Sequence, residues 1–145
     1  MLYPVAIEPG DEHRAFGVAV PDVPGCFSAG DTLDEAMANA KDAIELHFEA
    51  LADAGELPPL PSTLTEHSDN PDYAGWVWAL VDVDTEPYMG KASKINVTLP
   101  DLLAHKIDTV VGSSRAYKSR SHFLQVAALH ELEKMVALVG VGTKS

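Results

Sequence analysis

The first 90 residues alternate between short apolar runs and turn signals, a pattern typical of a small antiparallel sheet. Segments 2–9, 15–20 and 26–32 are rich in strand-forming residues and are separated by Pro-Gly and Pro-Asp pairs, so they predict three consecutive strands. A fourth strand is predicted at 75–84, "GWVWALVDVD", which is apolar on both faces. Because one helix covers only one face of a sheet, either another chain covers the second face or this strand is central in the sheet.

A helical period begins directly after the third predicted strand. Thr32 followed three residues later by Glu35 is the signature of a capping box, and Gly55 supplies a left-handed stop. Between these two signals the apolar residues recur at helical spacing: Leu33, Met37, Ala40, Ile44, Phe48 and Leu51. The prolines of residues 56–62 prevent a further helical turn, so this segment is expected to be extended. Residues 63–73 are expected to form a loop.

The C-terminal part has a different order of patterns. Residues 93–99, "SKINVTL", alternate polar and apolar positions as a strand does, and helices are predicted at about 101–111 and 120–139 with a polar stretch at 112–118 between them. The apolar side of the last helix is expected to comprise Phe123, Leu124, Ala127, Ala128, Leu132, Met135 and Val136. The pattern predicts one strand followed by two helices.

The strand predicted at residues 93–99 raises the question of its partner. No other strand is predicted in the last 50 residues, and a lone strand leaves its backbone hydrogen bonds unmade. If it pairs antiparallel with the same strand of a second copy, Lys94, Asn96 and Thr98 lie on the outer face of a two-stranded ribbon, and such a ribbon fits the major groove of DNA. The alternative is an edge strand of the first sheet.

The start of the last helix supplies a second candidate DNA contact. Ser119 is placed as the N-cap, and Lys118 and Arg120 flank it, so free backbone amides and two cations converge where a phosphate can dock. Serine caps are common and need not bind anything. The co-occurrence of this cap with the predicted ribbon is what favours DNA binding.

The net charge of −12 divides unevenly along the chain. Residues 1–90 hold two basic against 18 acidic residues, giving −16, whereas residues 91–145 hold eight basic against four acidic, giving +4. Together with the patterns, this predicts a domain at 1–86, a linker at 87–92 and a second domain at 93–145. An acidic body suits a cationic protein partner and a basic tail suits an anionic polymer, although an acidic surface can also simply keep a protein soluble.

Composition excludes several other classes. No run of about 18 apolar residues and no basic start followed by an apolar core occurs, so neither a membrane span nor a signal peptide is predicted and a cytoplasmic location is expected. The single cysteine, Cys26, excludes an internal disulfide and agrees with a reducing compartment. The 145 residues suffice for two small domains.

No catalytic residue, metal ligand or cofactor site is predicted. A two-metal nuclease needs clustered carboxylates, but the candidates are scattered among abundant acids and partly explained by turns: Asp22, Asp31, Asp82 and Asp84. The six histidines show no HxxxH or HExxH pairing, and Cys26 has no histidine near it in the sequence. His47 is interpreted as a packed core residue.

Two stretches resemble known families. "KINVTLPDLLAHKID" followed by "SRSHFLQVAALHEL" resembles a ribbon-helix-helix DNA-binding module, in which a strand pairs with its copy and two helices follow. "VPDVPGCFSAGDTLDEAMANAKDAIE" is similar to the more specific signature of HicB-type antitoxins. The connector "VGSSRAYKSRS" is longer than the tight turn of many such modules, so the end of the first helix stays open. The tail charge of +4 implies weak DNA binding by a monomer.

This resemblance implies an α+β fold: a small antiparallel-rich sheet on one main helix, like a partial RNase H, followed by a ribbon-helix-helix module. It implies a non-enzymatic antitoxin of a type II toxin-antitoxin pair that inhibits a HicA-type toxin, an mRNA-cleaving ribonuclease, and represses its own operon as a homodimer on operator DNA. It assigns no toxin-contacting residue, and whether the dimers associate into a higher oligomer stays open. The alternatives are a ligand-sensing ribbon-helix-helix repressor without a toxin and, third, a nuclease.

Overall fold

The protein consists of two compact units. The computed structural model describes the backbone of residues 1–143 and the side chains of residues 1–136. The first unit is Met1–Ala92, here called the sheet unit, and the second begins at Ser93 and is called the helical unit. Each unit is described by itself below.

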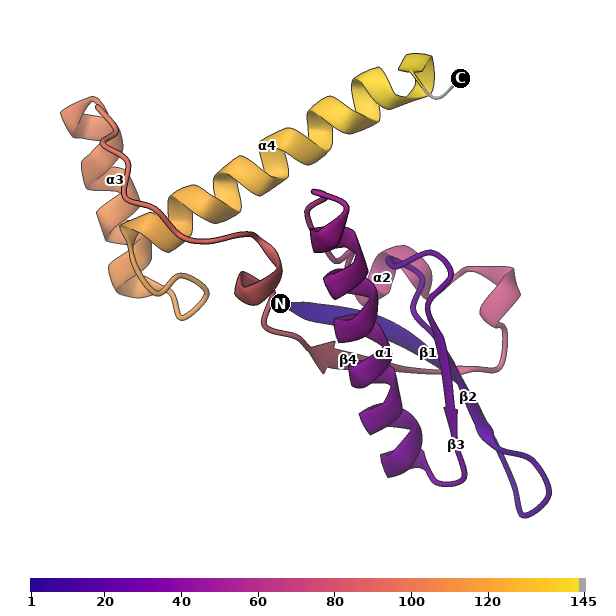
Figure 1. Cartoon of the computed structure of the whole chain (residues 1–145). Helices are drawn as coiled ribbons and strands as arrows, with labels where there is room; N and C mark the ends of the chain where they lie inside the picture. The colour runs from indigo at the N-terminus through magenta and orange to yellow at the C-terminus, as the bar shows by residue number, and fades with distance from the viewer. Residues whose placement is uncertain (144–145) are drawn as a thin grey trace. The chain divides into compact units, whose positions relative to one another are not determined.

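The sheet unit is a four-stranded antiparallel sheet with one long helix, α1, on one face (Figure 1). The strand order is β3-β2-β1-β4. The elements are β1 Leu2–Glu8, β2 Phe16–Ala19, β3 Phe27–Gly30, α1 Leu33–Asp53 and β4 Val77–Asp82. All four predicted strands and the main helix are therefore confirmed.

The core lies between α1 and the facing side of the sheet. Helix positions four residues apart, Ala36, Ala40, Ile44 and Phe48, are fully buried against alternate residues of the strands. These strand residues are Tyr3, Val5, Ile7, Val18 and Val81, and Val20 and Val83, directly after β2 and β4, complete the set. Two details of the predicted helical face were wrong, because Leu33 is exposed and Ala36 takes its place in the core.

Local signals explain how α1 begins and ends. Thr32 Oγ1 accepts a hydrogen bond from the Glu35 amide at 3.1 Å, which supplies the predicted N-cap. At the other end Gly55 has a φ of 76°, the Glu56 amide donates to Leu51 at 2.8 Å and the Gly55 amide donates to Ala52 at 3.0 Å. This is a Schellman motif, and it confirms the predicted stop.

The predicted position of β4 within the sheet needs correction. β4 pairs only with β1, from Leu2 opposite Asp82 to Ile7 opposite Val77, so it is an edge strand and the central alternative is wrong. Its outer edge is free of backbone partners from the described residues. The physical reason is that the chain supplies no fifth strand from its first unit. Val77 and Leu80 of this strand remain exposed.

The segment at 63–73, expected to be a loop, contains two short helices. They are α2 Leu64–His67 and the 3-10 helix η1 Pro71–Tyr73, and a further 3-10 helix, η2 Glu86–Tyr88, follows β4. The Thr63 and Glu66 pair forms a complete capping box, so the same T-x-x-E signature that predicted α1 is also present here. The loop expectation was therefore wrong at 64–67 and 71–73. Tyr88, inside the predicted linker, packs on Phe48 with ring centroids 5.8 Å apart.

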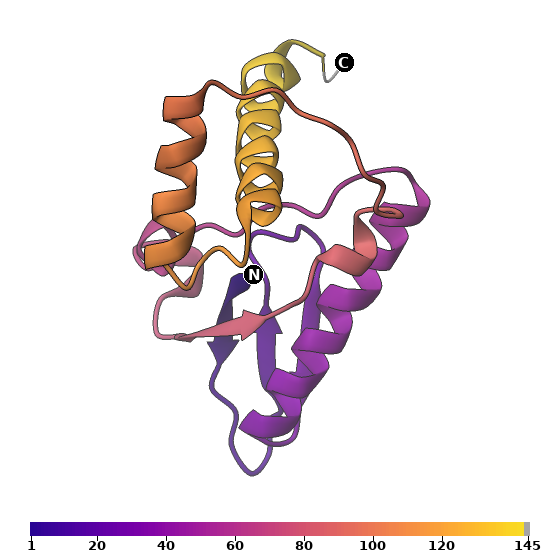
Figure 2. The ribbon, with the colours of Figure 1, turned by 90° about the vertical axis from the view of Figure 1, so that its left-hand side faces the viewer.

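The helical unit consists of α3 Asp101–Ser113 and α4 Arg120–Thr143, joined by the loop of residues 114–119 (Figure 2). Both predicted helices are present, and the end of the first is now placed at Ser113. Residues 91–100 have no regular structure in this single chain. A strand needs a neighbour for its backbone hydrogen bonds, so one copy cannot show the predicted pairing, which stays a prediction. None of the described helices has the length and apolar character needed to cross a bilayer.

Candidate functional site

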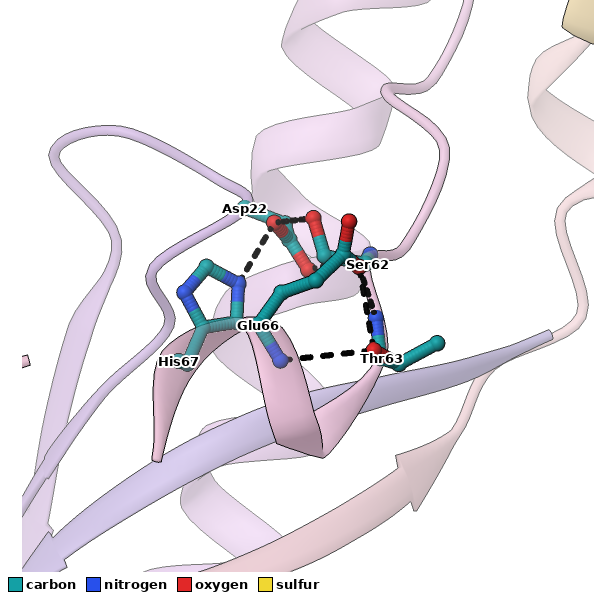
Figure 3. Close-up of polar contacts among 5 residues, drawn as sticks. All are labelled: Asp22, Ser62, Thr63, Glu66 and His67. Carbon is teal, nitrogen blue, oxygen red and sulfur yellow. Dashed lines mark hydrogen bonds and ion pairs between the residues drawn. The ribbon is translucent and has the colours of Figure 1, made fainter. Parts of the chain in front are cut away.

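A buried carboxylate joins three distant segments of the sheet unit. The Asp22 side chain, in the turn between β2 and β3, is 8% exposed. Its oxygens accept hydrogen bonds from the Ser62 amide at 2.7 Å, from Ser62 Oγ at 2.7 Å and from His67 Nε2 at 3.0 Å (Figure 3). We call Asp22, Ser62 and His67 the Asp22 cluster.

Neighbouring groups hold the Asp22 cluster in place. The Thr63–Glu66 capping box starts α2, which carries His67, and the His67 ring stacks on Trp78 of β4 with centroids 5.9 Å apart and planes inclined by 13°. The preceding proline segment is fixed by the Tyr3 hydroxyl, which donates to the Pro59 carbonyl at 2.6 Å. The cluster therefore holds the segment between α1 and β4 against the sheet.

The geometry of the Asp22 cluster is that of an anchor. Both His67 and Ser62 bond to the carboxylate, and no bond between His67 and Ser62 occurs among the described residues, so the imidazole is not placed to take a proton from the hydroxyl. The Asp22 oxygens are occupied by these donors. Sequence reasoning considered Asp22 as a metal ligand and missed Ser62 and His67, although the capping box beside them was a readable signal.

The other carboxylates weighed as metal ligands are not brought together. Asp82 accepts from the N-terminal amino group at 3.3 Å, Asp84 accepts from the Glu86 amide at 3.1 Å, and Asp31 is exposed. Within residues 1–136, no group of three or more His, Cys, Asp or Glu side chains is arranged to hold a metal ion. These residues have separate local roles at turns and termini.

A shallow groove lies between α1 and the start of β3. Its volume is about 300 Å³, and it is lined by Gly25, Cys26, Phe27, Ala43, Leu46, His47 and Ala50. We call it the α1–β3 groove. His47 is half-buried in its wall, so the interpretation of His47 as a core residue was wrong. Burial raises the pKa of the Cys26 thiol above its ordinary value, so this cysteine is held away from the reactive thiolate form although a histidine lines the same groove.

Most of the predicted DNA-reading strand is exposed to solvent. Lys94, Asn96 and Thr98 are exposed, but so are the apolar residues between them, with Ile95 at 78% and Val97 at 57%. Exposed apolar faces of this kind are common at interaction surfaces. Leu99 is half-buried.

The three residues of the second candidate DNA contact, Lys118, Ser119 and Arg120, differ in their surroundings. Ser119 is the N-cap of α4, since its Oγ accepts from the His122 amide at 3.1 Å, and Lys118 is exposed. Arg120 forms a two-point ion pair with Asp108 of α3, through Nε at 2.9 Å and Nη2 at 2.6 Å. The hydrogen bond from Arg120 lowers the pKa of the Asp108 carboxyl. Arg120 thus joins the two helices of its own chain, a role that the twelve-residue separation concealed in the sequence.

The fold and these surfaces define a class: a two-unit α+β protein with a buried polar cluster that anchors a loop and with exposed apolar residues in both units. The family described as "HicB_like antitoxin of bacterial toxin-antitoxin system" matches residues 3–128. The crystal structure of the Burkholderia pseudomallei antitoxin HicB superposes with a TM-score of 0.75 at 43% identity, covering 91% of this chain and 98% of that one.

Two further proteins are similar to this chain. An uncharacterized 14.9 kDa protein from the rep-hol intergenic region of Haemophilus phage HP1 is 46% identical over 132 residues, 91% of this chain and 98% of the phage protein. A chain of the HicA3 and HicB3 toxin-antitoxin complex matches with a TM-score of 0.51 at 33% identity, covering 58% of this chain and 99% of its own length. The present chain belongs to the HicB-like antitoxin family, which is non-enzymatic.

Proposed function

We propose that this chain is the antitoxin of a type II pair, that its sheet unit binds and inhibits a HicA-type mRNA-cleaving ribonuclease, and that its helical unit represses the operon that encodes both. The first half is supported by family membership and by the relative found in the HicA3 and HicB3 complex. The charge of −16 over residues 1–90 suits an RNA-cleaving partner, which we expect to be cationic because its substrate is a polyanion.

One observation carries the second half of the proposal: the helical unit buries almost nothing by itself. Among its described side chains, only Ile107 and Leu129 of the apolar residues are buried. Large apolar residues stay exposed on the segment before α3 and on both helices: Ile95, Val97, Leu102, Leu103, Val110, Leu132, Met135 and Val136. A unit of this size cannot form a stable core from two side chains.

A second copy supplies the missing core. Pairing the 93–99 segments edge to edge covers Ile95 and Val97 with the helices and leaves Lys94, Asn96 and Thr98 facing a DNA major groove, as in a ribbon-helix-helix dimer. Dimerisation doubles the charge of residues 91–145 from +4 to +8. Lys118, the Ser119 cap and Arg120 then flank the ribbon as phosphate contacts. Operator affinity falls steeply with salt because phosphate contacts release counterions.

The test of operator binding is a gel shift with the promoter DNA of the chain's own gene. Lys94→Ala and Asn96→Ala are expected to weaken binding by about 1–3 kcal/mol each if they read base edges. Glu12→Ala, in the turn between β1 and β2 of the sheet unit, is the control and leaves the shift unchanged. Unchanged binding in both ribbon variants shows that this segment is not the reader.

The test of toxin binding is co-expression with the short basic reading frame expected beside the gene, followed by affinity purification of the tagged antitoxin. Co-purification of a ribonuclease whose activity the antitoxin suppresses supports the proposal. If no such frame exists and the promoter shift responds to a small molecule, the chain is a ligand-sensing repressor instead. We further infer from the resemblance that the sheet unit is a partial RNase H-like fold and that the protein acts in the cytoplasm.

A further inference from the structure

The α1–β3 groove has an apolar rim. Phe27 and Leu46, on opposite sides of the groove, are 70% and 69% exposed, and Ala43 and Ala50 leave room between them on the helix side. Leu46 stands off the regular apolar spacing of α1, whose buried positions are 36, 40, 44 and 48. Packing within the chain therefore does not account for a leucine at this position.

An acidic ridge runs beside the groove on the solvent side of α1. Glu35, Asp42, Glu49 and Asp53 follow one another at intervals of seven, seven and four residues, so they share one face of the helix next to Leu46. All four are exposed, and none takes part in an ion pair among the described residues. The groove is thus an apolar depression flanked by four uncompensated carboxylates.

We propose that the α1–β3 groove is the toxin-docking surface: it takes an apolar side chain carried on a cationic segment of the HicA-type ribonuclease, whose basic residues pair with the acidic ridge. This inference rests on the proposed function and assigns its protein partner to one face of the sheet unit. Burial of Phe27 and Leu46 supplies the central anchor of the interface, and the ridge supplies attraction and orientation.

A second copy of this chain is a poor occupant of the same groove. It would bring its own −16 body against the acidic ridge, and like charges placed together at an interface are repulsive. Simple strand addition at the β3 edge is also obstructed, because Asn39 Nδ2 of α1 already donates to the Ala29 carbonyl at 2.8 Å. The partner therefore binds through side chains seated in the groove.

The experiment measures dissociation of the full-length antitoxin from the co-purified HicA-type toxin by surface plasmon resonance. Leu46→Gln keeps the size of the side chain and the net charge, and because Leu46 is exposed the variant folds normally. It is expected to raise the dissociation rate at least about tenfold, since anchor residues act mainly on dissociation. Leu80→Gln on β4 is the matched control, also an exposed leucine of the sheet unit, and it is expected to change the rate less than about twofold.

A second arm tests the acidic ridge. Asp42→Asn combined with Glu49→Gln is expected to slow association and to flatten its dependence on salt, with little effect on dissociation. The control removes the same amount of charge elsewhere: Glu12→Gln combined with Asp11→Asn in the β1–β2 turn. Equal slowing by both pairs indicates general attraction by the acidic body and contradicts a role for this ridge.

The outcomes separate the docking surface from the proposed function. If wild-type protein binds the toxin and Leu46→Gln dissociates no faster than Leu80→Gln, the surface is wrong and the function stands. If Leu46→Gln instead changes the oligomeric state of the free antitoxin, the groove holds a second copy and the inference is overturned. If wild-type protein does not bind the toxin, the proposed function fails and the docking surface fails with it.

Discussion

The two units differ in how they bury their apolar residues. The sheet unit encloses a contiguous core of 13 buried residues between α1 and the sheet, whereas the described part of the helical unit buries only Ile107 and Leu129 among its apolar side chains. Both units carry helices of similar length. The first unit therefore has a complete core as a single chain, whereas the exposed apolar residues of the second agree with our proposal that a second copy covers them.

Simple magnitudes support this contrast. Full burial of one large apolar side chain contributes roughly 1.5–3 kcal/mol, while ordering each residue of backbone costs about 1–2 kcal/mol. Two buried side chains do not offset the ordering of two helices and their connector. The helical unit should therefore gain its stability on association, and its unfolding should depend on protein concentration. The unfolding of the sheet unit should not.

The largest expected effect comes from a charge on the apolar face of the predicted ribbon. Val97→Asp would bury one unpaired carboxylate per copy, at a cost of several kcal/mol each. The dissociation constant of the dimer is therefore expected to rise at least about a thousandfold, and operator binding is lost. Analytical ultracentrifugation measures the change. Thr98→Asp, one residue along and on the opposite face, is the control: it abolishes DNA binding but leaves the dimer intact. Dissociation of both variants to the same degree shows that the two faces were assigned wrongly.

The second effect probes the closed core of the sheet unit. Phe48→Ala removes a fully buried ring that packs edge-on against Tyr3 at 5.3 Å and against Tyr88, so we expect a loss of about 3–5 kcal/mol in the free energy of unfolding. Leu46→Ala, two residues earlier and exposed, is expected to cost less than about 0.5 kcal/mol. Chemical denaturation at two protein concentrations is the measurement. A dependence of either value on concentration would contradict the view of this unit as self-contained.

A smaller effect is expected at the Asp22 cluster. Asp22→Ala leaves the Ser62 amide and hydroxyl and the His67 ring without their acceptor, at a cost of about 1.5–3 kcal/mol. The free energy of opening that hydrogen exchange measures at the Ser62 amide should fall by the same amount, because the segment between α1 and β4 loses its anchor. Asp31→Ala, in the same sequence stretch but exposed, should be nearly neutral. Retention of slow exchange at Ser62 in Asp22→Ala would show that the anchor lies elsewhere.

The structural features that could be predicted from the sequence are local ones. Strand alternation, the Thr32 cap and the Gly55 stop depend on residues within one turn or one strand, and each is confirmed by a hydrogen bond or a pairing register. Long-range contacts were not readable in this way. Asp22 meets Ser62 forty residues away and His67 forty-five residues away, and no periodicity links such positions.

Two points that the sequence left open have a common physical origin. The sequence shows that a side chain is apolar but not whether the covering atoms belong to the same chain. The second face of β4 was therefore assigned either to another chain or to a central position in the sheet, and the pairing of the 93–99 strand stays a prediction because one copy cannot form it. Leu46 is exposed and lies outside the buried helical spacing of α1, so its position in the sequence was a readable signal for the docking surface that we propose.

The smallest expected effect distinguishes two roles of Arg120. The pKa of Asp108 is lowered by its hydrogen bond from Arg120, so the stabilisation from this pair is present above the ordinary titration range of aspartate and is lost as the pH falls through the lowered pKa. Asp108→Asn removes that acid-dependent component of the helical unit's stability. Because both groups are exposed, the change at neutral pH is small.

The same substitution also tests Arg120 as a phosphate contact. If Arg120 binds the operator, Asp108→Asn removes a negative charge and frees the guanidinium, so DNA affinity increases and the salt dependence steepens. If Arg120 serves only to join α3 and α4, affinity stays equal or falls with the loss of helix packing. A gel shift at two salt concentrations separates these results. Lys118→Ala is the matched control, since Lys118 has no acidic partner among the described residues and should weaken binding in either case.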